Sequence, residues 1–202
     1  MEIAQKVFDR MLERDLTSWN TFISGYVRSG DPEKAISVFY DVAKGGQGLD
    51  YLTLVAILPA YADLMALKQG KEIHAYILRR SMGSNKFLMN CLIDVYMKSN
   101  FIMGSTRLFQ RMHDRDTVSW NIMISGLACH GHAMESLTLF HRMNQDGLVP
   151  DFVTLVAVLG ACDRVAALQF GKSLHAYLTR KGFDKGVTVG TALIDMYAKC
   201  GS

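Results

Sequence analysis

The chain has 202 residues, of which 50% are hydrophobic and 20% are charged, and its formal net charge is +3. This composition is typical of a folded globular chain and excludes disordered and collagen-like chains. The small positive charge permits a polyanionic partner but does not indicate one. No stretch of about 18 apolar residues is free of charged or turn residues, so the sequence predicts no membrane-spanning helix.

Low proline content and many helix-forming residues favour an all-helical chain. Only three prolines occur, alongside twelve methionines and abundant Leu, Ile and Ala. The first eleven residues, MEIAQKVFDRM, predict an amphipathic helix whose acidic residues distinguish it from a signal or transit peptide. We therefore expect no targeting segment in this sequence. The cysteines form no Cys-x-x-Cys motif and are typical of reduced, intracellular residues: Cys91, Cys129, Cys162 and Cys200.

Residues 16–50 predict a pair of helices. An apolar stripe at helical spacing runs from Trp19 to Val27. A break at Ser29-Gly30 is followed by Asp31-Pro32-Glu33, which supplies an N-cap, a proline at the first helical position and an early acidic residue. The second helix then runs to the glycine-rich KGGQG. One such hairpin cannot cover its own apolar face, so further hairpins must stack against it.

The sequence repeats itself at a distance of 101 residues. DLTSWNTFISG begins at Asp15 and DTVSWNIMISG begins at Asp116. The same offset aligns residues 52–80 with 153–181, and 91–100 with 192–201, without a gap. Self-similarity at a fixed period indicates a repeat architecture. The sequence therefore predicts an all-α, right-handed α-solenoid of helix-turn-helix repeats.

Each 101-residue unit divides into three parts. The asparagine of SWN has one counterpart at Asn90 and weaker counterparts at two valines, which gives spacings of 35, 35 and 31 residues. The W-x2-L-G-x2-Y phrase of tetratricopeptide repeats is absent. The positions that set these spacings are Asn20, Val55, Asn90, Asn121 and Val156.

Specific phrases resemble the plant pentatricopeptide repeat (PPR) family, and its PLS subclass in particular. SWNTFISGYVRSGDPEKAISVF and SWNIMISGLACHGHAMESLTLF resemble P motifs. LVAILPAYADLMALKQGKEIHAYILRR and its copy at 155–181 resemble L motifs, and NCLIDVYMKSN and TALIDMYAKCGS resemble S motifs. The resemblance covers the whole chain as a single repeat array. Its register gives a partial S motif at 1–15, P motifs at 16–50 and 117–151, L motifs at 51–85 and 152–186, an S motif at 86–116 and a partial S motif at 187–202.

The resemblance implies binding of single-stranded RNA, with about one base read by each repeat. In this family the fifth and last residues of a motif select the base. Asn with Asp favours uracil and then cytosine, whereas Thr with Asp favours guanine. The P and S motifs give Asn20 with Asp50, Asn90 with Asp116, and Asn121 with Asp151.

The L motifs are expected to read no base by hydrogen bonding. They carry Val55 with Asn85 and Val156 with Gly186, and a valine side chain has no hydrogen-bonding group. The expected footprint is therefore pyrimidine, blank, pyrimidine, pyrimidine, blank from 5′ to 3′.

Two further sets of residues are carried over from the resemblance. The second residue of a motif wedges between bases, and we expect this role for Leu52, Phe87, Val118 and Val153. Thr17 departs from that pattern. A basic residue near the end of the first helix contacts phosphate in some family members. Arg28, Lys98, Arg164 and Lys199 occupy this position, whereas Asp63 and Cys129 interrupt the basic stripe.

Several residues invite other interpretations. Helical spacing favours core packing over base stacking for Trp19 and Trp120, and His74 and His175 are expected to be packed or half-buried. The CHGH sequence at 129–132 is not repeated at the 101-residue offset, so we expect no metal there. GKS at 171–173 lacks the first glycine of a phosphate loop. No His-x-Glu or Cys-x-x-Cys motif of a zinc deaminase occurs. We expect no catalytic residue and no cofactor.

The resemblance implies a plant mitochondrial or chloroplast protein that acts in RNA processing, as a specificity factor for C-to-U editing. The chain would not be an enzyme itself but would position a deaminase supplied by another domain or by a partner. An alternative is a helical-repeat scaffold that binds editing-complex proteins through its L and S motifs. The twelve methionines could furnish an adaptable peptide groove. RNA binding would weaken steeply with salt, whereas peptide docking need not.

Overall fold

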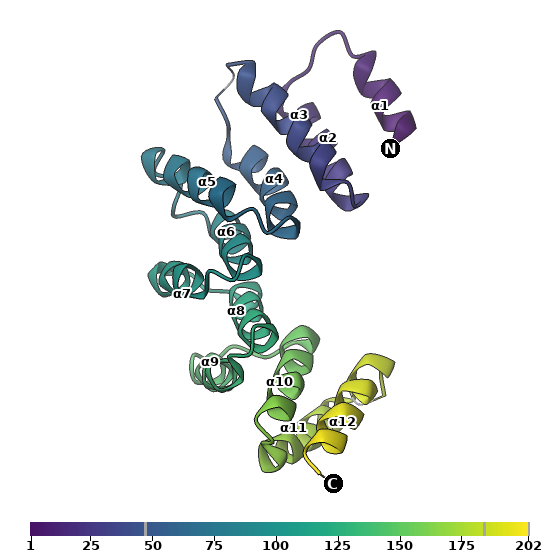
Figure 1. Cartoon of the computed structure of the whole chain (residues 1–202), viewed down its shortest axis with the longest axis vertical. Helices are drawn as coiled ribbons and strands as arrows, with labels where there is room; N and C mark the ends of the chain where they lie inside the picture. The colour runs from purple at the N-terminus through teal and green to yellow at the C-terminus, as the bar shows by residue number, and fades with distance from the viewer. Residues whose placement is uncertain (47, 184, 202) are drawn as a thin grey trace. The chain divides into compact units, whose positions relative to one another are not determined.

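The computed structural model describes residues 1–46, 48–183 and 185–201. Gln47 of the first predicted P motif, Asp184 of the second predicted L motif and Ser202 of the final partial motif lie outside these ranges. The described residues form twelve α-helices and no strand (Figure 1), so the all-α prediction is confirmed. None of these helices has the length and apolar character needed to cross a membrane. The chain divides into two compact units, Met1–Met112 and His113–Ser202.

The first unit is a stack of helical hairpins. Helix α4 packs against both α2 and α6, so these three helices form one row, and each of α3, α5 and α7 packs beside the helix that precedes it. The short helix α1 packs against α2. The helices are α1 (Glu2–Asp9), α2 (Leu16–Arg28), α3 (Pro32–Lys44), α4 (Tyr51–Asp63), α5 (Leu67–Arg79), α6 (Lys86–Lys98) and α7 (Ile102–Arg111).

The second unit has the same construction. Helix α10 packs against both α8 and α12, while α9 packs beside α8 and α11 beside α10. In both units, therefore, the first helices of successive hairpins lie next to one another. The helices are α8 (Thr117–Cys129), α9 (Ala133–Gln145), α10 (Phe152–Arg164), α11 (Leu168–Lys181) and α12 (Val187–Lys199).

Aspartate begins four of these first helices. Each aspartate side chain accepts a hydrogen bond from the backbone N–H three residues later, which satisfies one of the donors left free at a helix start. Such a cap stabilises a helix by about 1 kcal/mol. The capping residues are Asp15 for α2, Asp50 for α4, Asp116 for α8 and Asp151 for α10.

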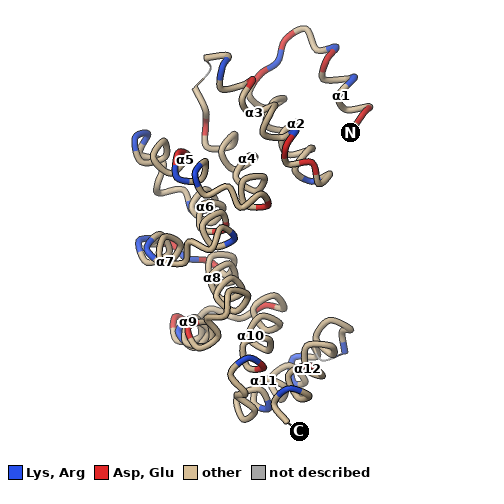
Figure 2. Tube along the Cα trace, viewed as in Figure 1, with Lys and Arg blue, Asp and Glu red and all other residues tan. Residues whose placement is uncertain are grey.

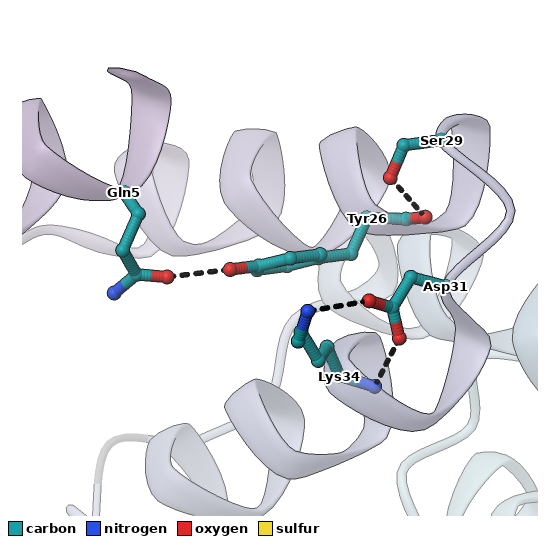
Figure 3. Close-up of polar contacts among 5 residues, drawn as sticks. All are labelled: Gln5, Tyr26, Ser29, Asp31 and Lys34. Atoms are coloured by element: carbon teal, nitrogen blue, oxygen red, sulfur yellow. Dashed lines mark hydrogen bonds and ion pairs between the residues drawn. The ribbon is translucent and has the colours of Figure 1, made fainter. Parts of the chain in front are cut away.

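The turn between α2 and α3 forms as its sequence predicts (Figure 3). Asp31 accepts from the backbone N–H of Lys34 at 3.2 Å and pairs with the Lys34 ammonium at 2.8 Å, and Pro32 occupies the first helical position. The Ser29 hydroxyl donates to the Tyr26 carbonyl at 2.9 Å. The Tyr26 hydroxyl donates to Gln5 Oε1 and so links α1 to α2.

The two tryptophans differ in their burial. Trp120 is fully buried in the second unit, so the core prediction is confirmed for this residue. Trp19 is partly exposed and lies between the Phe8 ring, with centroids 4.7 Å apart, and the Arg14 guanidinium, 5.8 Å from its ring.

A His–Tyr contact recurs in both units and joins α5 to α6 and α11 to α12. Nδ1 of His74 lies 2.9 Å from the Tyr96 hydroxyl, and Nδ1 of His175 lies 2.9 Å from the Tyr197 hydroxyl. Burial, with a smaller contribution from Arg111, lowers the pKa of His74. Both histidines are half-buried, as predicted, and they connect neighbouring hairpins.

Candidate nucleic-acid interface

A groove lies between α2 and α4 in the first unit. This first groove has a volume of about 530 Å³. Asn20 and Arg28 bring polar groups from α2, while the α4 wall is apolar. The α4 residues that line it are Leu52, Val55, Ala56 and Pro59.

A second groove, of about 390 Å³, lies between α8 and α10 in the second unit. Most of its lining residues follow those of the first groove by 101 residues: Leu52 corresponds to Val153 and Val55 to Val156. Cys129 takes the place of Arg28. The internal duplication thus builds the same surface feature once in each unit.

The predicted pair Asn20 and Asp50 comes together at the first groove. Asn20 projects from the second turn of α2, and Asp50 caps α4. The Asn20 amide nitrogen lies 3.5 Å from Asp50 Oδ1, at the long limit for a hydrogen bond. Asp50 Oδ1 also accepts from the backbone N–H and the hydroxyl of Thr53, both at 2.7 Å.

The predicted pair Asn121 and Asp151 is held more closely in the second unit. The Asn121 amide nitrogen donates to both carboxylate oxygens of Asp151, at 3.0 and 2.9 Å. The Thr154 hydroxyl contacts the Asn121 carbonyl oxygen. Asn121 is only 8% exposed, so its amide is fixed by these partners rather than by solvent.

Both aspartates are held as carboxylates. Burial alone would raise the pKa of Asp50, but hydrogen bonds from Thr53 and Asn20 outweigh that effect and lower it. The pKa of Asp151 is lowered in the same way, with burial opposed by hydrogen bonds from Thr154 and Asn121. Each unit therefore holds an amide beside an ionised carboxylate at neutral pH, and of these side chains Asn20 lines a groove.

The third predicted pair is divided between the two units. Asn90 is buried on α6 in the first unit, and Asp116 caps α8 in the second, where it forms a capping box with Ser119. The pairing of Asn90 with Asp116 stays a prediction.

The four residues expected to wedge between bases are exposed apolar side chains. They lie at the second residue of their helices in α4, α6, α8 and α10, and between 49% and 62% of each side chain is accessible. Leu52 and Val153 also line the two grooves. Phe87 and Val118 are the most exposed of the set. Their roles in stacking stay predictions.

The four basic residues predicted to contact phosphate differ in the partners that they already have within the protein. The Lys98 ammonium pairs with Asp63 at 3.0 Å and Asp94 at 3.3 Å, and that of Lys199 pairs with Asp163 at 2.7 Å. The pairs Lys98–Asp63 and Lys199–Asp163 join residues 35 and 36 positions apart, on the first helices of successive hairpins. Sequence reasoning did not foresee them, because it gave no account of which side chains meet across stacked hairpins.

Arg164 and Arg28 complete the set. The Arg164 guanidinium donates to the carbonyl oxygens of Ala128 and Cys129, the latter at 3.2 Å, and so satisfies acceptors at the end of α8. Arg28 is exposed, lines the first groove and contacts no acidic side chain among the described residues. Charges are sparse on the first helices (Figure 2), since α8 carries none and α4 only Asp63.

Sequence reasoning missed Thr53 and Thr154. Both are fully buried, and both contact the aspartate of the candidate pair. The sequence pattern that could have identified them is Asp-x-x-Thr. It has the spacing of a capping box, with threonine in place of the usual glutamate or glutamine. Within the described ranges, no three His, Cys, Asp or Glu side chains are grouped so as to hold a metal ion.

Comparison with known families finds matches along the chain. The model described as PPR repeat family matches residues 115–164, and the model described as PPR repeat matches residues 17–46 and 87–117. Among solved structures, the pentatricopeptide repeat protein PPR10 from maize matches with a TM-score of 0.69 and 18% identity, covering 99% of this chain and 29% of that one. PPR10 in complex with an 18-nt psaJ RNA element matches with a TM-score of 0.71 and 22% identity, covering 87% and 27%. These likenesses confirm the helical-repeat fold.

Curated proteins of Arabidopsis thaliana are similar over nearly the whole chain. Putative pentatricopeptide repeat-containing protein At3g23330 is 36% identical over 202 residues, which is 28% of its own length. The mitochondrial protein At3g09040 is 35% identical over 201 residues, which is 20% of its length. The chloroplastic protein At3g22150 is 37% identical over 97% of this chain and 24% of its own. The chain thus spans 20 to 28% of these relatives.

Proposed function

Because the chain belongs to the pentatricopeptide repeat family, we propose that it is a PLS-type repeat module that binds single-stranded RNA. The observation that carries the proposal is the Asn–Asp pair that recurs in each unit between the first helices of successive hairpins. A structural cap alone would need only the aspartate. The asparagine adds an amide that the aspartate orients, which is the kind of group that reads the edge of a base.

The chemistry of each pair suits a neutral pyrimidine. An amide offers two donors and one acceptor, and the carboxylate of Asp50 or Asp151 restrains that amide from one side. The apolar wall formed by Leu52 or Val153 and the residues beside it would pack against the face of a base. Base stacking contributes about 1–3 kcal/mol per base. The valines of the intervening motifs supply contact area without hydrogen-bond selection.

The names of the relatives At3g09040 and At3g22150 place them in the mitochondrion and the chloroplast, which supports an organellar location for this chain. We further propose that it acts as a specificity factor in C-to-U RNA editing. In that role it would hold a defined pyrimidine-containing segment, while a separate domain or a partner protein supplies the deaminase.

Fluorescence anisotropy with two short RNAs tests the proposal. One RNA carries uracil at the slots facing Asn20, Asn90 and Asn121, and the other carries purines there. We expect the uracil RNA to bind about tenfold more tightly, and both affinities to fall as salt is raised. Equal affinities for the two RNAs would contradict base selection by the Asn–Asp pairs.

Substitution of Arg28 should alter the salt dependence of binding. Arg28→Gln is expected to reduce the slope of log affinity against log salt by about 0.7, the value for one phosphate contact on a single strand. Lys98→Gln is the matched control, because the Lys98 ammonium is already paired with Asp63 and Asp94 and should change the slope less. The measurement is a salt titration of each variant with the same RNA. A larger change for Lys98→Gln would reverse our assignment of the phosphate contact.

A second candidate function, protein binding, is favoured by a pocket between α9 and α11. It has a volume of about 260 Å³ and is lined by the rings of Phe140, Phe170 and Tyr177, with Arg180 among its residues. Aromatic residues and arginine are enriched at protein interfaces. L and S motifs would then contact editing-complex proteins while the grooves between first helices bind RNA. This candidate takes the lead if the anisotropy measurement shows no base preference.

A further inference from the structure

A buried threonine lies behind each Asn–Asp pair. Thr53 and Thr154 are the third residues of α4 and α10, and neither has any accessible surface. They cannot contact RNA directly. Each hydroxyl has a single proton, so it can donate fully to only one acceptor at a time.

In the first unit the Thr53 hydroxyl donates to Asp50 Oδ1 at 2.7 Å. The Asn20 carbonyl oxygen is buried and has no hydrogen-bond partner among the described residues. With only a 3.5 Å contact from its nitrogen to Asp50 and no donor to its carbonyl oxygen, the Asn20 amide is weakly restrained. A buried acceptor without a partner is unfavourable, so a donor that reaches it is favoured.

In the second unit the same three residue types are arranged differently. The Thr154 hydroxyl lies 2.5 Å from Asn121 Oδ1 and 3.0 Å from Asp151 Oδ1, so two acceptors compete for its proton. The Asp151 backbone N–H donates to the Thr154 hydroxyl oxygen at 3.2 Å. When Thr154 donates to Asn121, the amide is held at both ends, because Asp151 accepts from its nitrogen.

We infer that Thr53 and Thr154 are positioning residues that determine which hydrogen-bonding groups of Asn20 and Asn121 remain available to a base. The inference rests on the proposed RNA function and deepens it. The two slots are consequently unequal despite identical residues: the amide of Asn121 is held at both ends, whereas the amide of Asn20 is held only by a long contact with Asp50, and its buried carbonyl oxygen has no donor among the described residues. The Asn121 slot therefore discriminates between bases more strongly than the Asn20 slot.

The test compares Thr154→Val, Thr154→Ser and Thr53→Val in the full 202-residue chain. Two RNAs are used, each with a purine at only one slot, facing either Asn20 or Asn121. Thr154→Val should reduce discrimination at the Asn121 slot by about fivefold, the effect of one net hydrogen bond, and leave the Asn20 slot unchanged. Thr154→Ser keeps the hydroxyl and should restore discrimination. Thr53→Val should act only at the Asn20 slot, and by a smaller factor.

A second measurement needs no RNA. In the free protein, the side-chain amide protons of Asn121 should exchange with solvent more slowly than those of Asn20, as followed by nuclear magnetic resonance. Thr154→Val should accelerate exchange at Asn121, and Thr154→Ser should not. If the wild-type chain shows no base preference while this exchange pattern holds, the proposed function fails but the positioning role stands.

Two results would overturn the inference. The first is unchanged amide exchange at Asn121 and unchanged discrimination at its slot in Thr154→Val. The second is an equal loss of affinity for every RNA together with a lower melting temperature, which would mean that Thr154 only stabilises the start of α10.

Discussion

Replacing Asn121 with threonine is expected to change the base preferred at its slot from a pyrimidine to guanine. The relative affinity for the two bases should shift by about tenfold, which corresponds to about 1.4 kcal/mol. The physical reason lies in the carboxylate of Asp151, which now accepts from the Asn121 amide at 3.0 and 2.9 Å. Threonine has no amide to occupy the carboxylate, so Oδ2 of Asp151 loses its partner while Oδ1 keeps the backbone N–H of Thr154. The carboxylate can then accept from the N–H donors on the Watson–Crick edge of guanine.

Competition anisotropy with four RNAs that differ only at this slot would measure the change. Asn20→Thr is the matched control, because it alters the same residue type beside Asp50 and should shift preference at a different slot. A variant that loses affinity for all four RNAs alike would indicate that Asn121 supports the fold and does not select the base.

Replacing Trp120 with alanine should lower the free energy of unfolding by more than the same substitution at Trp19, the other tryptophan of the chain. Trp120 is fully buried in the second unit, and truncating a buried tryptophan costs about 3–5 kcal/mol through lost contacts and the cavity left behind. Trp19→Ala should cost less, because Trp19 is partly exposed and packs at the edge of the first unit against Phe8 and Arg14.

Urea denaturation followed by far-ultraviolet circular dichroism would compare the two variants with the wild-type chain. Repeat proteins can unfold in stages, so the midpoint of the least stable transition is the quantity to compare. Equal midpoints for Trp120→Ala and Trp19→Ala would contradict the burial described for these residues.

Periodicity and capping chemistry made the local structure predictable. The stripe that begins at Trp19 predicted a helix where α2 is found, and Asp31-Pro32-Glu33 predicted the start of α3. The 101-residue offset predicted that features of one unit recur in the other, as the two grooves and the two His–Tyr contacts do.

Details of the candidate site lay beyond the sequence because they depend on distances between stacked helices. Asn20 and Asn121 occupy equivalent positions beside identical partners, yet their contacts with aspartate differ by 0.5 Å or more. Likewise, Lys98 and Arg164 carry charges that suggest phosphate contacts, but one is paired with carboxylates and the other with helix carbonyls. Such competition for a side chain is decided by geometry and not by residue type.

Asp50 and Asp151 each serve two neighbouring repeats. Each accepts from the asparagine of one hairpin and also begins the first helix of the next. Few residue types begin a helix well, mainly Asp, Asn, Ser, Thr and Gly. During evolution, a substitution at either aspartate that removes the helix cap is therefore selected against because it destabilises the fold, whatever its effect on RNA binding. Lineages that acquire new targets are expected to vary the asparagine first and to retain the aspartate. The array would then diversify by changing one residue of each base-selecting pair.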